Sequence, residues 1–311
     1  ESFGPRARTR VSRTLWAALW LALCATSASA QVRYATGQNV VPVFEGWERL
    51  PDGSFDMVFG YMNRNYEQQV ELPVGADNTL EPGAPDQGQP THFYPRRQQF
   101  VFKVRVPKDW GKKDLVWTLR VNGRTEKAYA SLLPHAELGP FVYQENRGST
   151  ATITDTPEAN EAPRLTVDGA AAATAVVDTP LTLSLRVTDD GHPVPRRRPA
   201  GANAVRRDSD GAVITATGTP GPGGTGVRGE NPLTQAVVRL EPGVALGVTW
   251  IVYRGPGAAV SFEPQRQAVE EGRAATRVRF ARPGTYTLRA YADDGILLTA
   301  ADVTVDVKGQ P

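Results

Sequence analysis

Cysteine is almost absent from this chain, because Cys24 is the only one among 311 residues. A disulfide needs two cysteines, so no bridge can form within the chain and its folded parts must be stabilised by buried apolar surface. We also expect Cys24 to be removed with the N-terminal segment that contains it. No thiol would then be left for catalysis.

Histidines and short active-site motifs are scarce as well. The three histidines, His92, His135 and His192, stand in no H-E-x-x-H or other paired metal spacing. No nucleophile elbow G-x-S-x-G and no P-loop is present. Acidic residues are plentiful, so a pair of glycosidase-type carboxylates stays open by residue type alone, although no pair stands out. We therefore expect no catalytic residues and a protein that is not an enzyme.

Long apolar runs are confined to the N-terminus. Four arginines precede an apolar run at residues 15–25, and Ala28-Ser29-Ala30 offers a small-residue cleavage site. This order predicts a secretory signal peptide at residues 1–30, because the run is too short to span a bilayer comfortably. Leu23 is a poor fit to the small residue before a lipidated cysteine, so Cys24 is interpreted as an ordinary signal residue. The sequence thus predicts export to the periplasm, the cell surface or the medium.

An excess of charge of one sign is missing too. The predicted signal contains four of the 35 basic and one of the 33 acidic residues, which leaves 31 against 32, a net charge of −1. Global charge therefore favours neither a nucleic-acid nor a membrane partner. No later stretch is long and apolar enough for a transmembrane span.

Alternating residues are plentiful and predict an all-β fold. Residues 274–307 contain three strand patterns, joined by Arg282-Pro283-Gly284 and by Asp293-Asp294-Gly295. One apolar and one polar face per strand is typical of antiparallel sheets. Leu181 to Val187 and the row Val248, Trp250 and Val252 supply partner strands. With 30 glycines and 25 prolines, turns are frequent.

The first half contains a clear hairpin signal. Asn122-Gly123 separates two strand patterns, and both turn residues tolerate the positive φ of a type I′ turn. A two-residue loop pairs Val121 with Arg124 and Trp117 with Ala128. Large residues then oppose small ones on one face, as expected of a sandwich core.

The residues from Trp250 to Gly295 carry a resemblance. Trp250, the run Gly284-Thr285-Tyr286-Thr287-Leu288 and Asp293-Asp294-Gly295 together resemble immunoglobulin-like and PKD-like domains of bacterial secreted proteins. The resemblance implies a buried Trp250 and a tyrosine corner at Tyr286. Leu288 stands where antibody domains have a cysteine. The first half resembles other exported bacterial proteins, which implies export but no activity.

These patterns predict two antiparallel β-sandwich domains. We expect an N-terminal sandwich at residues 31–138, a linker at 139–162 and an immunoglobulin-like domain at 163–308. Residues 195–235 are rich in Gly, Pro and Arg and poor in core-forming residues, so they predict a long disordered insertion. Phe141-Val142-Tyr143 is a candidate edge strand.

Several residues near the predicted turns of the first sandwich are candidates for ligand binding: Trp47, Asn63, Arg64, Asn65, Tyr66 and Trp110. Aromatic rings beside amide and guanidinium donors suit sugar or peptide recognition. The competing interpretation is that the aromatic residues are core, since aromatic residues are common in β-sandwich interiors. The long loop at residues 73–95 is a second candidate surface.

Two Asp-Asp-Gly turns are weak candidates for Ca²⁺. Asp189, Asp190, Asp293 and Asp294 lie in loops that converge at one end of an immunoglobulin-like sandwich, and Ca²⁺ prefers several oxygen ligands. Ordinary turn chemistry explains the same residues, because Asp binds its own backbone and Gly takes positive φ. No EF-hand spacing is present.

The expected function is that of an exported, non-enzymatic binding or structural protein of the bacterial envelope that contacts a protein partner. A carbohydrate-binding module is the alternative, and a hydrolase of unrecognised type is the third interpretation. A flat apolar patch or a long free edge strand would favour a protein partner. A coplanar exposed aromatic platform would favour a sugar.

Overall fold

A computed structural model describes residues 34–147, 160–169, 171–193, 206–207, 213–214, 236–240 and 244–310. The predicted signal peptide and most of the predicted insertion lie outside these residues. Within them, no helix has the length and apolar character needed to cross a membrane. Contacts within the chain group Ala35 to Pro311 into one compact unit. This grouping does not separate the two predicted domains, so their boundaries stay a prediction.

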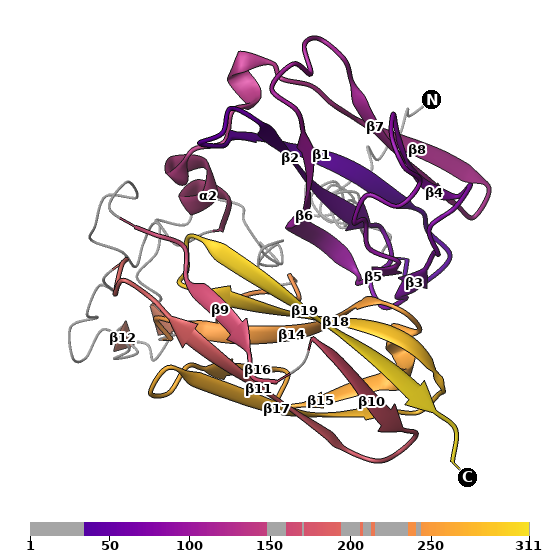
Figure 1. The fold of residues 1–311 in the computed structure, drawn as a ribbon, viewed down its shortest axis with the longest axis vertical. Helices are drawn as coiled ribbons and strands as arrows, with labels where there is room; N and C mark the ends of the chain where they lie inside the picture. Colours follow the sequence, from indigo (N-terminus) through magenta and orange to yellow (C-terminus); the bar gives the residue numbers. More distant parts are fainter. Residues whose placement is uncertain are drawn as a thin grey trace, which may run out of the picture. The chain divides into compact units, whose positions relative to one another are not determined.

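The first half of this unit is a small sandwich (Figure 1). Its elements are β1 (Val40–Arg49), β2 (Phe55–Asn63), β3 (Val70–Glu71), β4 (Asn78–Glu81), β5 (His92–Phe93), β6 (Arg96–Val106), β7 (Leu115–Val121) and β8 (Arg124–Ala130). One sheet has the order β1-β2-β6, a second has the order β4-β7-β8, and β3 pairs with β5. All these pairs are antiparallel.

The core of the first sandwich is aromatic. The Trp117 ring is fully buried and meets Phe59 and Phe102 edge-on at centroid distances of 5.9 and 4.9 Å. Such edge contacts add to the apolar area that the rings remove from water. The Trp117 indole N–H donates to Asn78 Oδ1 at 3.0 Å, so the one polar atom of the ring is satisfied. The two sheets therefore meet through large side chains of β2, β6 and β7.

The predicted hairpin is confirmed in register and in turn type. Val121 pairs with Arg124 and Trp117 with Ala128, while Asn122 and Gly123 have φ values of 51° and 74°. One other expectation is wrong. The predicted edge strand at 141–143 lies in helix α2 (Pro140–Arg147), which follows the short helix η1 (Pro134–Ala136).

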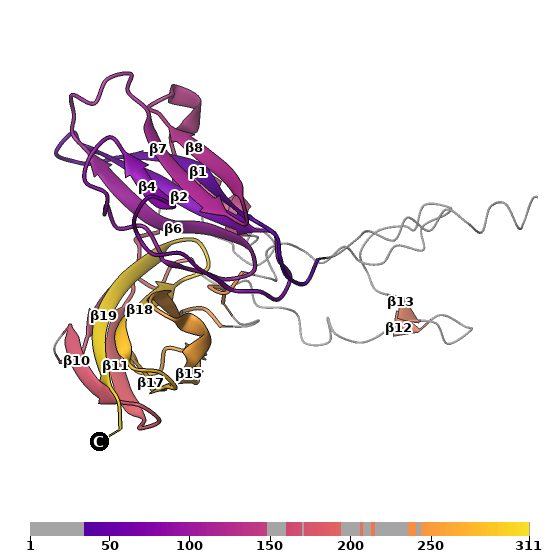
Figure 2. The ribbon, with the colours of Figure 1, turned by 90° about the vertical axis from the view of Figure 1, so that its right-hand side faces the viewer.

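The second half is a larger sandwich, whose two sheets lie face to face in Figure 2. Its elements are β9 (Arg164–Val167), β10 (Ala172–Val176), β11 (Leu181–Thr188), β14 (Gly247–Arg254), η4 (Gly257–Ala259), β15 (Val260–Glu263), β16 (Arg266–Ala268), β17 (Arg273–Phe280), β18 (Gly284–Asp293) and β19 (Leu298–Lys308). The sheets have the orders β15-β17-β11-β9 and β10-β19-β18-β14-β16. Two described pieces of the predicted insertion, β12 (Arg206–Arg207) and β13 (Val213–Ile214), pair with each other.

Strand order and two side chains make the second sandwich immunoglobulin-like. If β9, β11, β17 and β15 are strands A, B, E and D, they form one sheet, and β14, β18 and β19 form the C-F-G sheet that faces it. Trp250 on β14 is fully buried. The Tyr286 hydroxyl donates to the Arg282 carbonyl at 2.8 Å, which completes the tyrosine corner. The all-β, antiparallel, immunoglobulin-like expectation is thus confirmed; the narrower PKD-like resemblance stays a prediction.

An irregularity in β6 divides its apolar side chains between two clusters. The ladder with β2 shifts register between the partners of Phe59 and Tyr61, and Phe100 inside the shift has a φ of 53°. Phe102 packs in the main core of the first sandwich, whereas Phe100 packs with Tyr143 of α2 and with Ile296. A bulky residue at positive φ is costly, so the surrounding packing must hold it there.

Candidate functional site

The structure places the predicted aromatic ligand-binding residues mainly in the interior. Trp47 and Trp110 are buried, and their indole N–H groups donate to the carbonyls of Leu133 and Lys113 at 2.8 Å each. Tyr66 is partly exposed, and the Arg96 guanidinium lies 3.9 Å from its ring centroid. Trp47, Trp110 and Tyr66 thus do not form one coplanar exposed platform.

The two asparagines of the predicted turn organise the backbone. Asn63 and Asn65 are fully buried, and the Asn63 amide donates to the carbonyls of Gln68 and Phe93 at 2.8 and 3.1 Å. Asn65 accepts a hydrogen bond from the Gln38 N–H at 2.7 Å. These buried amides thus satisfy backbone N–H and C=O groups that have no partner strand to bond. Arg64, between them, is exposed.

The four aspartates considered for Ca²⁺ accept hydrogen bonds within their own turns. Gly191 N–H donates to Asp189, His192 N–H to Asp190 and Gly295 N–H to Asp293, at 2.8 to 3.0 Å. Asp294 accepts from the backbone of Ile296 and Leu297, both at 2.7 Å. Within the described part of the chain, no three His, Cys, Asp or Glu side chains are grouped to hold a metal ion.

The two Asp-Asp-Gly turns are connected by the stretch before β9. The Asn160 amide donates to Asp294 at 3.0 Å, and the Glu161 N–H donates to Asp190 at 2.8 Å. Burial raises the pKa of Asp294 to about 6, against these hydrogen bonds, which favour the carboxylate. The two turns thus lie near one another as predicted, and Asn160 and Glu161 bind them together.

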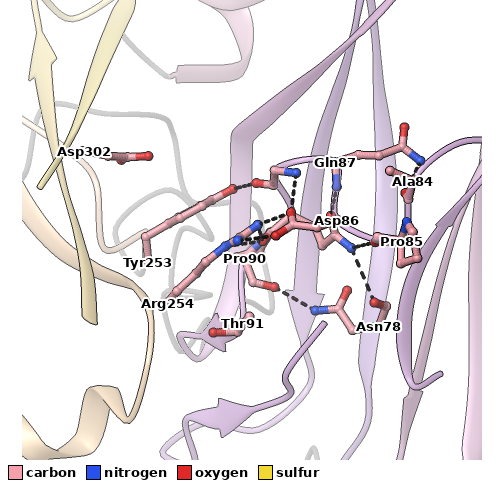
Figure 3. Close-up of polar contacts among 12 residues, drawn as sticks. Asn78, Ala84, Pro85, Asp86, Gln87, Pro90, Thr91, Tyr253, Arg254 and Asp302 are labelled. Carbon is pink, nitrogen blue, oxygen red and sulfur yellow. Dashed lines mark hydrogen bonds and ion pairs between the residues drawn. The ribbon is translucent and has the colours of Figure 1, made fainter. Parts of the chain in front are cut away.

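The long loop at residues 73–95 is ordered by amide side chains. Asn78 donates to Pro90 O at 2.8 Å, and Gln87 donates to three carbonyls of the loop at 2.9 to 3.2 Å. Gln89 donates to Pro85 O at 2.6 Å. Figure 3 shows the Asn78 and Gln87 side chains among the labelled residues of this loop. The loop therefore presents Asp86, Gly88 and Gln89 in fixed positions, although only the short strands β4 and β5 inside it are regular structure.

That loop binds the second sandwich through the end of β14. The Arg254 guanidinium makes a bidentate ion pair with Asp86 at 2.7 and 2.8 Å, and it also donates to the Gln89 carbonyl at 2.8 and 3.0 Å (Figure 3). Arg254 holds the pKa of Asp86 down at about 2. The Asp86 side chain is 55% exposed, so water screens this pair and its contribution to stability is small.

Buried and partly buried tyrosines make further contacts between the sandwiches. The Val252 N–H donates to the Tyr94 hydroxyl at 2.9 Å, and Tyr291 donates to the Val101 carbonyl at 2.9 Å. The Tyr253 hydroxyl donates to the Gly88 carbonyl. Burial raises the pKa of Tyr94 to about 12 and also raises that of Tyr253. The Tyr94 and Tyr253 hydroxyls thus stay protonated, and each of the three hydroxyls takes the place of a water molecule at the contact.

Apolar packing extends across the same boundary. Ile251, Tyr253 and Tyr291 of the second sandwich belong to the cluster of buried side chains that forms the core of the first. Ile296, in the loop between β18 and β19, is fully buried in a separate cluster with Val58, Phe100 and Tyr143. We call these contacts, together with the Arg254–Asp86 pair and the tyrosine hydrogen bonds, the joint.

The tightest point of the joint is His92 against Gly257. His92 is 2% exposed, and its Nε2 lies 2.7 Å from Gln69 Oε1. A Cβ placed on Gly257 would lie 2.3 to 2.5 Å from three atoms of the His92 ring. Burial lowers the pKa of His92 to about 4, so the ring is neutral near pH 7. A glycine in η4 is thus required by the opposite sandwich.

The sequence interpretation missed the residues of the joint. Val248, Trp250 and Val252 were assigned to one buried face of their strand, yet Ile251 and Tyr253 on its other face are apolar too. An unbroken apolar run is typical of a strand buried on both faces. That signal could have revealed that β14 is covered on its outer side.

Comparisons with known proteins add little to this description. No protein-family model matches the chain, and no curated protein matches it in sequence. Similar solved structures include domains 4 and 5 of the S-layer protein SbsC, with 8% identity over 63% of this chain and 65% of that one, at a TM-score of 0.23. They also include fibronectin(III)-like modules of Clostridium thermocellum CbhA (10% identity, 87% and 95%, TM-score 0.24) and the D0-D1 domain of intimin (10%, 86% and 100%, TM-score 0.23).

The chain spans just under two thirds of the length of the S-layer fragment. TM-scores this low carry no argument about fold or function. The immunoglobulin-like assignment therefore depends on the strand order and on the tyrosine corner at Tyr286.

Proposed function

We propose that this chain is an exported, non-enzymatic binding or structural protein of the bacterial envelope, which presents its two sandwiches to a protein partner as one rigid body. The joint is the observation that carries the proposal. Its buried tyrosines, His92 and Arg254 are used in contacts between the sandwiches instead of surrounding an open cleft. A joint that is both apolar and hydrogen-bonded favours a fixed arrangement, whereas domains with small polar contacts move. Export is supported by the predicted signal peptide.

On the first sandwich we propose Arg64 and Tyr66 as contact residues, because both lie at the surface. Trp47, Asn63, Asn65 and Trp110 would act by holding the surrounding backbone. A carbohydrate-binding module is the second candidate, favoured by the exposed hydroxyl and guanidinium side chains on the outer side of the sheet β15-β17-β11-β9.

The test is chemical cross-linking of tagged residues 31–311 in the envelope fraction of the host, followed by mass spectrometry. We expect one protein to be captured reproducibly, through the same residues of this chain, and captured less by Gly257→Ala, which disturbs the joint. Recovery of the bait alone would contradict a protein partner. Hydrolysis of an envelope polymer by the purified chain would contradict a non-enzymatic role.

A further inference from the structure

The solvent-facing side of the sheet β15-β17-β11-β9 carries five arginines: Arg164, Arg186, Arg273, Arg277 and Arg279. Their strands turn leucine, valine and phenylalanine inward, so period-2 alternation places these arginines together on the outer side. The other outward positions of the four strands are Ser, Thr, Ala and Glu263. We call this side the arginine face.

Arginine is frequent throughout the chain, 29 residues against six lysines, so its presence alone decides nothing. Its distribution on the sheet is informative. Arg186 and Arg273 are direct cross-strand neighbours, an arrangement that is destabilising for like charges. A single carboxylate, Asp168, lies between them, 2.8 Å from Arg186 and 3.9 Å from Arg273. Two guanidinium groups thus share one anion.

The remaining ion pairs on this face are weak. Arg164 lies 3.8 Å from Glu161, and Arg277 lies 4.0 Å from Glu263. The side chains of Arg164, Arg186, Arg273 and Arg277 are 62 to 83% exposed. Exposed pairs of this length contribute little to stability, so an incoming anion can displace them readily.

A hollow lies where the arginine face meets β16, the neighbouring strand of the opposite sheet. Ser184 and Ala275 form a cross-strand pair of small residues between the Arg186–Arg273 pair and the pair of Thr182 with Arg277. They border a hollow of about 400 Å³, whose polar lining is Asp168, Ser184, Gln267, Glu270 and Arg273. Hydroxyl, amide, carboxylate and guanidinium groups therefore meet in one depression.

We propose that the arginine face binds a linear acidic polysaccharide. Arg273, Arg277 and Arg279 lie along one strand over about 20 Å, at about 3.4 Å per residue, which suits anionic groups spaced along a polymer. Guanidinium groups bind carboxylates and sulfates, while Asp168 and Glu270 accept hydrogen bonds from sugar hydroxyls. No aromatic ring lies on these strands' outer side to stack on a base or to anchor a protein.

This inference rests on the proposed function for one point, that the protein meets the polysaccharide at the bacterial envelope. Binding itself does not depend on that location, so it is tested on purified residues 31–311. The probes are polygalacturonate and dextran sulfate, with uncharged dextran, poly-glutamate and a single-stranded oligonucleotide for comparison. The variant R273Q/R277Q/R279Q removes three charges from the arginine face. The control R120Q/R124Q/K127Q removes three charges from β7 and β8.

We expect the two acidic polysaccharides to bind more tightly than dextran, poly-glutamate and the oligonucleotide. The arginine-face variant should bind them about tenfold more weakly and with a shallower salt dependence, and the control within about twofold of the parent. Should the glutamine variant fail to fold, R273K/R277K/R279K keeps the charge, loses bidentate geometry and should bind with intermediate strength.

Several results would overturn the proposal: no binding of either acidic polysaccharide, equal losses in the arginine-face and control variants, or equal binding of dextran. Binding of poly-glutamate or of the oligonucleotide as tightly as the polysaccharides would identify another class of partner and also overturn it. The polysaccharide-binding test does not affect whether cross-linking captures a protein partner at the envelope. The proposed function and the polysaccharide proposal can therefore be refuted independently.

Discussion

Gly257→Ala is the sharpest test of the joint, because it adds one methyl group whose three nearest atoms all belong to His92 of the opposite sandwich. Gly257 does not have a left-handed φ, so its own backbone accepts alanine. The new Cβ would lie 2.3 to 2.5 Å from the His92 ring, well inside contact distance. That ring is buried and lies 2.7 Å from Gln69, so it cannot swing into solvent without losing this contact. Overpacking of this kind costs about 1–3 kcal/mol.

Urea unfolding of residues 31–311 measures this loss, with Gly309→Ala as control. Gly309 also lacks a left-handed φ, and a Cβ there has no heavy atom within 4 Å, so the control should leave the midpoint unchanged. Gly257→Ala is also measured in a His92→Ala background, which removes the ring that the new methyl group contacts. In that background Gly257→Ala should cost about 0.5 kcal/mol or less. An equal loss with and without the ring, or no loss at all, would refute the reasoning.

Three further predictions concern the two cores and the pH dependence of stability. Trp117→Ala removes a fully buried ring and should lower the free energy of unfolding by about 3–5 kcal/mol. Urea unfolding measures this loss, with substitution of the exposed Tyr129 by alanine as the control. An unchanged midpoint for Trp117→Ala would place Trp117 outside the core. Tyr286→Phe leaves the buried corner without the hydrogen bond to Arg282 O and should cost about 0.5–1.5 kcal/mol, and a neutral result would remove the tyrosine corner from the account. Because burial lowers the pKa of His92 from 6.5 to about 4, the stabilisation from neutral His92 is complete above pH 6.5 and is lost as the pH falls towards 4, by at most about 3 kcal/mol. Asp294 acts in the opposite direction, since its pKa is raised to about 6 and its ionisation costs stability as the pH rises from 3.8 to 6. The His92 effect is therefore measured as the difference in the pH dependence of stability between the parent protein and His92→Asn. Identical profiles for those two proteins would contradict it.

The regular parts of the fold could be predicted from the sequence because local chemistry determines them. Asn122-Gly123 specifies both the turn and the register of its hairpin, and the observed pairing agrees residue by residue. The alternation in residues 274–307 likewise predicts β17, β18 and β19, with Tyr286 in its corner. In these segments one buried face and one turn leave little choice of structure.

The joint could not be predicted in the same way, since it depends on contacts far apart in sequence. Nothing local indicates that Phe100 takes a φ of 53° and leaves the face of Phe102, because the cause is packing against α2 and Ile296. Phe141-Val142-Tyr143 favoured a strand by its residue types. The signal that was overlooked is Pro140, which is well suited to the first position of a helix.

The candidate site was predicted least well, for a related reason. Trp47 and Trp110 have the composition of a binding surface, but each ring faces inward and finds a backbone carbonyl. Composition near a turn does not tell which side of the strand is covered. The arginine face depends on the same kind of information, since its residues become neighbours only once β9, β11 and β17 are paired.

The most direct test of the rigid joint is a distance measurement between the sandwiches by double electron–electron resonance. Residues 31–311 contain no cysteine, so Lys127→Cys on β8 and Ser261→Cys on β15, both exposed, give two defined spin-label sites. We predict a single narrow distance distribution that broadens when Gly257→Ala is added. A broad distribution in the protein without that substitution would contradict the claim that the two sandwiches act as one body.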